Sequence, residues 1–202
     1  MADTWTHKMA RVCVRPLIGT GVTPNHITTL RVATGLASCA AVALGTPSGA
    51  LWGGVLWLAS AFLDRADGEL ARIGDMKSRG GHLYDYYSDA LINSLVFAGA
   101  GIGARHGWMG VWAAPTGVVA AVSMLVCWVV GEWYQQLEGS GEKAYAGRWG
   151  FDMDDGLYLI APLIWFGLMS FVVLGAAVAT SCMAILIIVR YRRLRARRGL
   201  AR

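Results

Sequence analysis

The sequence predicts an all-helical (all-α) integral membrane protein, in which six transmembrane helices follow an N-terminal interfacial amphipathic helix. Hydrophobic residues make up 55% of the 202 residues and the mean hydropathy is +0.46, more apolar than an ordinary soluble domain. Long runs also lack any charged residue, namely Val32 to Leu63, Gly107 to Gly131 and Gly156 to Val189. Because about 20 apolar residues cross a bilayer, the first and last runs each hold more than one helix.

Turn signals divide these runs into the six expected helices. The GTPSG segment from Gly45 to Gly49 breaks the first run, since glycine and proline favour a tight turn. The last run carries no strong turn signal, and we place its turn near Gly175. The expected helices span residues 24–44, 50–74, 82–104 and 107–131, followed by two short spans within 156–189.

The chain is expected to form one membrane domain with a short extension at each end. Residues 1–22 mix apolar and basic side chains between Trp5 and Ile18, a pattern typical of an interfacial amphipathic segment. Residues 23–192 are expected to hold the six-helix domain, and residues 193–202 form a basic tail on the cytoplasmic side.

The basic residues predict the orientation of the chain. An even number of spans puts both termini on one side, and Lys and Arg concentrate on the cytoplasmic side. Of the 18 Lys and Arg, only Arg105 falls in a loop on the opposite face. We expect an integral protein of a bacterial inner (plasma) membrane, with termini and active site cytoplasmic. Membrane lipids then account for the net charge of +5, and no motif indicates nucleic acid as a partner.

Four aspartates lie where one apolar segment turns into the next, and they are the candidate site. Ionised carboxylates near the hydrocarbon region are costly, so they indicate a functional site with a partner charge. Asp64 and Asp67 are three residues apart, and Asp85 and Asp89 are four apart, so each pair occupies one helix face. The glycine-containing stretch between the pairs is long enough for the chain to turn back. The two pairs are therefore expected to face each other.

The donor set predicts a hard divalent metal. Carboxylate oxygens without a Cys or His partner favour Mg²⁺ or Mn²⁺ over zinc or copper. Two such ions about 4 Å apart can hold both the attacking and the leaving oxygen in a phosphoryl displacement. Gly68 and Ala71 would let a flat ligand approach the helix backbone, and Arg72 supplies a planar donor suited to phosphate.

The residues match the pattern DxxDGxxARx(8)GxxxDxxxD, and on this motif the chain resembles the CDP-alcohol phosphotransferases, or CDP-alcohol phosphatidyltransferases. All eight fixed positions fit: Asp64, Asp67, Gly68, Ala71, Arg72, Gly81, Asp85 and Asp89. The resemblance implies that Asp64, Asp67 and Asp85 bind two metal ions that hold a CDP-linked donor. It implies that Asp89 contacts metal and acts as the base, that CMP leaves, and that homodimers form.

Two further stretches match the family at single positions. Thr23 and Pro24 open the first span with a capping residue and a proline at the first helical position. In the family this stretch also lines the CDP site, so the resemblance implies Asn25 and Thr28 as donor ligands. Ser78 falls where the family places a donor-contacting hydroxyl, although it also suits a loop cap.

The acceptor region departs from the family members that use inositol phosphate, which carry Lys and Arg on the fourth and fifth spans. Here acidic residues stand at about those positions, and only Lys143 and Arg148 remain as cations in the loop; the acceptor candidates are Glu132, Arg148, Asp154 and Asp155. An anionic pocket repels phosphate and favours a neutral polyol or an amine-bearing acceptor. Acidic residues at a helix start are also favoured by the helix dipole alone, so both interpretations stay open.

We therefore expect an enzyme of phospholipid biosynthesis that transfers a substituted phosphate from a CDP-linked donor to a small hydroxyl acceptor. CDP-diacylglycerol is the favoured donor, because a lipid-tailed nucleotide would lie at the bilayer surface. A soluble CDP-alcohol with a lipid or polyol acceptor is the alternative within the same chemistry. A cation transporter with intramembrane carboxylates is the alternative of another class, and it predicts polar residues at mid-depth in several helices.

Overall fold

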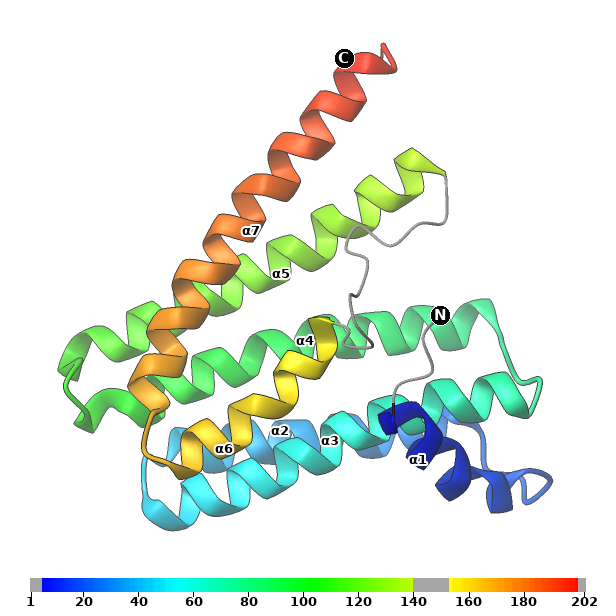
Figure 1. Cartoon of the computed structure of the whole chain (residues 1–202), viewed down its shortest axis with the longest axis horizontal. Helices are drawn as coiled ribbons and strands as arrows, with labels where there is room; N and C mark the ends of the chain where they lie inside the picture. The colour runs from blue at the N-terminus through cyan, green and yellow to red at the C-terminus, as the bar shows by residue number, and fades with distance from the viewer. Residues whose placement is uncertain (1–4, 140–152, 200–202) are drawn as a thin grey trace.

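The computed structural model describes residues 5–139 and 153–199, and every regular element within these ranges is a helix (Figure 1). Short 3-10 turns at Arg15–Leu17, Ala104–His106 and Gly110–Trp112 connect the longer helices, and a 3-10 segment at Met153–Leu159 leads into α6. The helices are α1 (Trp5–Val14), α2 (Pro24–Ala43), α3 (Pro47–Ile73), α4 (Arg79–Gly103), α5 (Ala113–Glu138), α6 (Ile160–Trp165) and α7 (Met169–Arg197).

Helix α4 lies at the centre of the bundle. It packs against α2 on one side and α5 on the other, while α3 packs against α2 and α7 packs against α5. The apolar core between these helices includes Val42, Trp57, Ile92, Val96 and Phe97. The short helix α1 lies against the end of α3, close to the turn between α3 and α4 (Figure 1). Helix α2 therefore packs against both α3 and α4, and the α3–α4 turn joins the carboxyl end of α3 to the amino end of α4.

The predicted start of the first span and the first predicted turn are confirmed. Thr23 precedes α2, Pro24 is its first residue, and the Thr23 backbone N–H donates to His26 Nδ1 at 3.3 Å. The GTPSG turn separates α2 from α3, and Thr46 caps α3 by accepting from the Gly49 N–H at 3.0 Å. Gly45 has a φ of +67°, a left-handed conformation that favours glycine.

The expected turn near Gly175 is wrong. Helix α7 runs unbroken through that position, and the chain instead turns at residues 166–168, where Gly167 has a φ of +74°. Gly175 lies inside a helix, where glycine is tolerated without a turn. Gly167 adopts a positive φ, a conformation that favours glycine, and it therefore marks the turn. The fourth expected helix also differs, since α5 begins at Ala113 and extends to Glu138. The segment before the turn, residues 153–165, is roughly 23 Å long by helical rise, shorter than a bilayer core.

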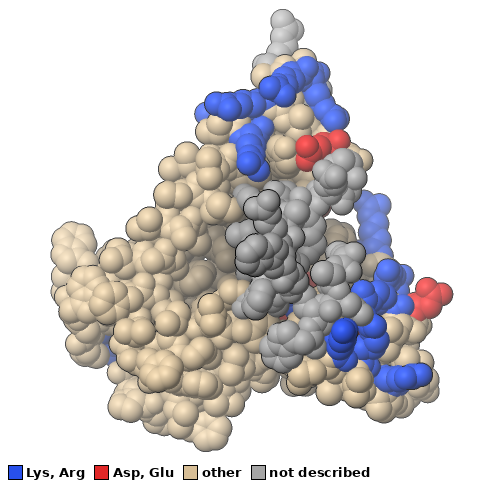
Figure 2. Space-filling model, viewed as in Figure 1, with Lys and Arg blue, Asp and Glu red and all other residues tan. Residues whose placement is uncertain are grey.

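Two of the described helices are long and apolar enough to cross a membrane, Gly110–Glu138 and Met169–Arg197. Charged side chains are unevenly placed around them. Figure 2 shows Lys and Arg gathered at the far end of α7 and near α1, and a broad uncharged face on the left of the view. The α7 residues in this group include Arg192, Arg193 and Arg195, all exposed. Such a distribution is typical of a protein with basic ends outside an apolar layer.

Glycines let α4 approach its neighbours closely. A Cβ on Gly101 would lie 2.8 Å from the Ala113 carbonyl oxygen and from the Gly117 Cα on α5. A Cβ on Gly99 would lie 2.7 Å from the Cys39 carbonyl oxygen on α2. Small residues at helix contacts allow backbones to pack closely in membrane proteins. The position of α4, and of the aspartates on it, therefore depends on these glycines.

Replacing Gly101 with valine should force α4 and α5 apart. Overpacking of this kind costs about 2 kcal/mol, so we expect Gly101→Val to unfold at a lower temperature in detergent than the unmodified protein. The matched control is Gly175→Val on α7, because a Cβ there meets nothing within 4 Å. Equal unfolding temperatures for the two variants would contradict the close α4–α5 contact.

Candidate active site

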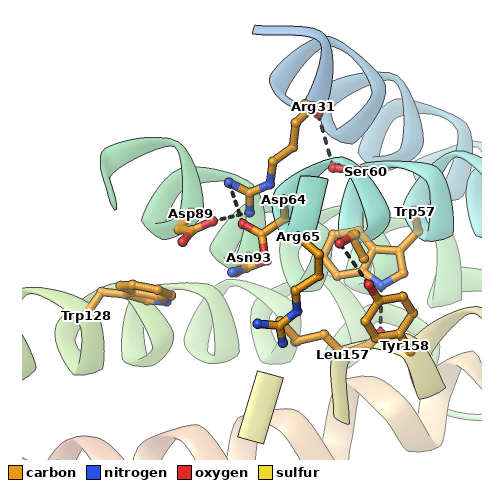
Figure 3. Close-up of a pocket in the computed structure, with 11 residues that line it drawn as sticks. Arg31, Trp57, Ser60, Asp64, Arg65, Asp89, Asn93, Trp128, Leu157 and Tyr158 are labelled. Carbon is orange, nitrogen blue, oxygen red and sulfur yellow. Dashed lines mark hydrogen bonds and ion pairs between the residues drawn. The ribbon is translucent and has the colours of Figure 1, made fainter. Parts of the chain in front are cut away.

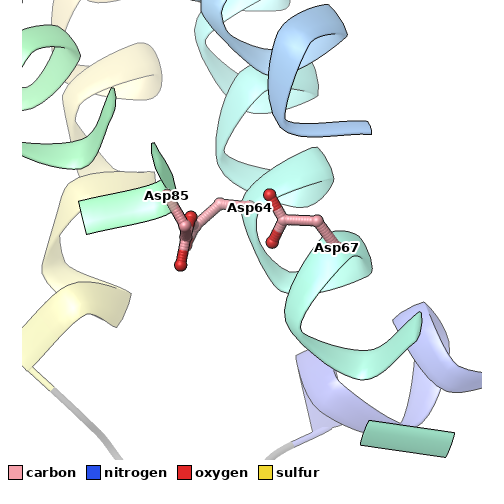
Figure 4. A group of neighbouring side chains, drawn as sticks. All are labelled: Asp64, Asp67 and Asp85. Carbon is pink, nitrogen blue, oxygen red and sulfur yellow. The ribbon is translucent and has the colours of Figure 1, made fainter. Parts of the chain in front are cut away.

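The four predicted aspartates come together where α3 ends and α4 begins. Asp64 and Asp67 lie one turn apart on α3 and face Asp85 on α4 (Figure 4). One carboxylate oxygen from each of these three residues lies within 4.8 Å of the other two. Asp89 follows Asp85 by one turn on α4 and lines the adjoining cavity. The pairs therefore face each other across the two helices.

Helix α2 contributes a hydrogen bond to this group. Thr28 is 2% exposed, and its hydroxyl donates to Asp67 Oδ2 at 2.6 Å. Asp67 is itself 3% exposed, so this hydrogen bond orients a carboxylate that solvent barely reaches. The Thr28 hydroxyl thus points at an aspartate of the motif.

A buried arginine lies among the carboxylates. Arg31, one turn after Thr28 on α2, is 2% exposed and forms an ion pair with Asp89 (Figure 3). Its Nη1 lies 3.4 Å from Asp64 Oδ1 and 3.8 Å from Asp85 Oδ1. A single guanidinium therefore faces three carboxylates from two other helices. Buried charges of one sign are tolerated only with such a partner.

Arg31 was not among the predicted site residues, although the sequence carries a signal for it. Arg31 is the last charged residue before the charge-free run that starts at Val32, so it lies inside an apolar helix. An arginine inside a span usually has a partner charge or a functional role, and here the aspartates are that partner.

The donor set fits a hard divalent cation. Asp67 Oδ1 is buried and has no hydrogen-bond partner among the residues that the structure describes. Asp85 Oδ1 also lacks a hydrogen bond there, although the Arg31 guanidinium lies 3.8 Å away. Carboxylate oxygens left in this way are costly unless a cation approaches them. All the ligand atoms offered by Asp64, Asp67 and Asp85 are oxygens, the donors that Mg²⁺ and Mn²⁺ prefer. The orphaned oxygens and the donor chemistry therefore agree.

A cavity adjoins the carboxylates between α2, α3, α4 and α5. Its polar lining brings Arg31, Asp64, Asp89 and Asn93 to one small space, and aromatic rings close it (Figure 3). The remaining lining residues are Trp57, Ser60, Ala61, Arg65, Trp128, Leu157 and Tyr158. Trp57 Nε1 donates to the Leu157 carbonyl at 2.7 Å, which ties the 153–159 segment to α3. A small polar group can reach Asp89 from this cavity.

The predicted donor-binding residues surround the start of α2 and the α3–α4 turn. Gly68 is exposed, and a Cβ there would meet nothing within 4 Å, so the backbone is open to a ligand. At Gly81 a Cβ would lie 3.2 Å from Asn25 Oδ1 and 2.9 Å from Ser78 Oγ, so glycine permits both side chains to approach. Ser78 also caps α4 by accepting from the Gly81 N–H at 3.0 Å.

Two other motif positions lie on the last turns of α3. Ala71 is partly exposed, and Arg72 is exposed and paired with Glu69. Ala71 follows Gly68 by three residues and shares its side of the helix. The small residues and the guanidinium thus lie together at the carboxyl end of α3.

The predicted acceptor residues are only partly covered by the structure. Glu132 is half-buried on α5, one turn after Trp128, and accepts a hydrogen bond from Gln136 Nε2 at 2.9 Å. Arg148 and the side chains of Asp154 and Asp155 lie outside the described residues. The residues that do surround Asp89, such as Asn93, were not among the predicted acceptor contacts.

Comparison with known proteins agrees with this geometry. A model of the CDP-alcohol phosphatidyltransferase family matches residues 21–189. The chain therefore belongs to the CDP-alcohol phosphatidyltransferase family, whose members are membrane proteins. As such it is an enzyme, a phosphotransferase of phospholipid synthesis.

Individual relatives are phosphatidylinositol phosphate synthases. The chain is 32% identical over 171 residues to the synthase of Corynebacterium glutamicum, covering 80% of this chain and 72% of that protein. Two structures of the Mycobacterium tuberculosis synthase share the fold, each with a TM-score of 0.69 and 18% identity. The one with bound CDP-diacylglycerol aligns over 93% of both chains. The one with manganese and citrate aligns over 92% of this chain and 88% of that chain.

Replacing Arg31 with glutamine should destabilise the protein, because three carboxylates would lose their buried cation. Breaking a buried ion pair typically costs about 3 kcal/mol, so Arg31→Gln should unfold at a clearly lower temperature in EDTA. Added Mn²⁺ should recover part of the loss by supplying positive charge. Lys77→Gln, which removes an exposed charge near the α3–α4 turn, is the control. If the two variants unfold alike, Arg31 does not balance the aspartates.

Proposed function

We propose that the enzyme transfers a phosphatidyl group from CDP-diacylglycerol to the hydroxyl of a small polar acceptor and releases CMP. The observation that carries the proposal is the group of carboxylate oxygens from Asp64, Asp67 and Asp85, set beside Asp89 and an adjoining cavity. Family membership supports the reaction class. The bound CDP-diacylglycerol of the M. tuberculosis synthase supports the choice of donor.

The four aspartates are proposed to hold two ions, Mg²⁺ or Mn²⁺. Asp64, Asp67 and Asp85 supply the converging oxygens, and Asp89 contributes from the next turn of α4. When bound, the ions would neutralise the charge of the donor pyrophosphate and of the departing CMP. Thr28 supports this role, because its hydroxyl donates to Asp67 Oδ2 and leaves Asp67 Oδ1 available to a metal ion.

Asp89 is proposed as the base that takes the proton of the acceptor hydroxyl. It lines the cavity, so a hydroxyl entering there lies next to its carboxylate. The ion pair with Arg31 restricts the orientation of the Asp89 carboxylate. Asn93, on the next turn of α4 and 6% exposed, offers an amide that can hold the acceptor.

The donor nucleotide is proposed to lie over the open backbone of α3 and the start of α2. Gly68 and Ala71 leave room for a flat group, and Arg72 can bind a phosphate oxygen. The exposed Asn25 lies close to Gly81, so both are placed to contact the same ligand. Thr28 and Ser78 complete the predicted set, although each hydroxyl already serves an internal contact, to Asp67 and to the first turn of α4.

The membrane arrangement belongs to the same proposal. Six spans with the site and both termini on the cytoplasmic side of a bacterial inner membrane would place the basic ends near anionic lipid. The exposed arginines at the end of α7 and around α1 support this orientation. The division into residues 1–22, 23–192 and 193–202 and the formation of homodimers remain predictions.

The acceptor is proposed to be neutral or amine-bearing, because Glu132 lies on α5 one turn after the cavity-lining Trp128 and acidic residues follow in the next segment. The relatives named for phosphatidylinositol phosphate favour a phosphorylated acceptor instead. A soluble CDP-alcohol donor is a further alternative within the family. Family membership favours all of these over the cation transporter.

The decisive assay follows CMP release by the purified protein with CDP-diacylglycerol and Mn²⁺ or Mg²⁺. We expect CMP only when a metal and a suitable acceptor are both present, and EDTA should abolish it. The panel contains serine, inositol, inositol phosphate, glycerol phosphate, choline and ethanolamine. Turnover with phosphorylated acceptors alone would overturn the proposal of a neutral or amine-bearing acceptor. Cation flux into liposomes without CMP release would favour a transporter.

Asp89→Asn should separate binding from chemistry. The amide keeps the size of the side chain but cannot take a proton, so CMP release should fall at least about a hundredfold. Binding of CDP-diacylglycerol, measured directly, should persist. Asp75→Asn is the matched control, because Asp75 is exposed at the α3–α4 turn and asparagine tolerates its φ of +52°. Normal turnover by Asp89→Asn would remove Asp89 as the base.

A further inference from the structure

A second buried charge cluster lies next to the site, around Glu69. The Glu69 side chain is 1% exposed, and all of its described partners are basic residues. His7 Nδ1 lies 2.9 Å from its Oε1, and the Arg11 Nε donates to its Oε2 at 3.0 Å. The third partner, Arg72, forms an ion pair with Oε1 from the next turn of α3.

The cluster joins two parts of the molecule that are distant in sequence. His7 and Arg11 lie on α1, whereas Glu69 and Arg72 lie on the last turns of α3, and Figure 1 shows α1 lying against this end of α3. A buried carboxylate is tolerated because these basic groups meet it. Removing a basic partner would leave Glu69 less well satisfied and free to turn.

The two carboxylate oxygens of Glu69 link α1 to the last turns of α3. Arg11 occupies Oε2 of Glu69, and this contact sets the plane of the carboxylate. The other oxygen, Oε1, is then directed at Arg72 and His7. Arg72 is more than a third exposed, and its ion pair with Glu69 Oε1 attaches the guanidinium to this cluster. Glu69 therefore links the position of Arg72 to the docking of α1.

We propose that Glu69 is a positioning residue, through which the docked helix α1 holds Arg72 in the orientation that binds a phosphate of the CDP-linked donor. The proposal rests on the proposed function, because it takes Arg72 as a phosphate ligand. It assigns α1 a part in donor binding in addition to its expected place at the membrane surface. The chemical step at Asp89 does not involve this cluster, so donor affinity should change and turnover should not.

The test compares two charge-removing variants of the same helix. Arg11→Gln loses the contact with Glu69, whereas Lys8→Gln loses an exposed charge of α1 that has no described contact with Glu69. Both variants reduce the attraction of α1 to anionic lipid equally. We expect Arg11→Gln to raise the KM for CDP-diacylglycerol about fivefold, the loss of one modest hydrogen bond, with kcat within about twofold. Lys8→Gln should leave both constants unchanged.

Two further variants keep the result interpretable. Glu69→Gln preserves size and should raise the KM at least as much as Arg11→Gln, while Arg11→Lys should restore part of the lost affinity because it returns the charge. Equal KM values for Arg11→Gln and Lys8→Gln, or a fall in kcat with an unchanged KM, would overturn the proposal.

Direct binding separates this proposal from the proposed function. The shift in unfolding temperature caused by CDP with Mn²⁺ is measured on the unmodified protein, Lys8→Gln and Arg11→Gln. A smaller shift for Arg11→Gln alone supports the link even if no acceptor yields CMP, in which case only the proposed reaction fails. A shift that is equal in all three proteins, or absent from all three, overturns the link.

Discussion

The structure depends on holding four carboxylates together inside an apolar bundle. Their mutual repulsion in a medium of low dielectric opposes the approach of α3 and α4. Arg31 offsets this repulsion from α2, where it reaches Asp64, Asp85 and Asp89, and Thr28 satisfies one oxygen of Asp67. Helix α2 thus contacts every aspartate of the motif while contributing none of them.

Close packing of the α2 and α4 backbones allows Arg31 to contact the aspartates on α4. A Cβ on Gly35 of α2 would lie 2.6 Å from Ile92 Cγ2 on α4, and a Cβ on Gly99 of α4 would lie 2.7 Å from the Cys39 carbonyl oxygen of α2. Larger residues at these contacts would push α2 away from α4 and disturb the contact between Arg31 and Asp89. The small residues therefore belong to the site as much as the charges do. They also explain why α4, which carries Asp85 and Asp89, is the central helix.

The sequence was sufficient for the features that local spacing determines. The facing pairs of aspartates follow from helical periodicity, and the break at Gly45 follows from turn chemistry. The break at Gly167 was missed because Gly167 and Gly175 look alike in sequence, and only the backbone angle distinguishes them. Arg31 was missed because its partners lie more than 30 residues away along the chain.

The end of α3 carries two sets of buried acidic groups, and each set is met by basic groups from a different helix. Arg31 of α2 meets the aspartates, and His7 and Arg11 of α1 meet Glu69. Since a buried charge without its partner is strongly destabilising, the last turns of α3 are stable only when both helices have docked. The motif segment supplies Arg72 to Glu69, but without α1 and α2 it lacks the other basic groups that balance its buried carboxylates. The active-site geometry is a property of the assembled bundle, and α1 is part of that assembly.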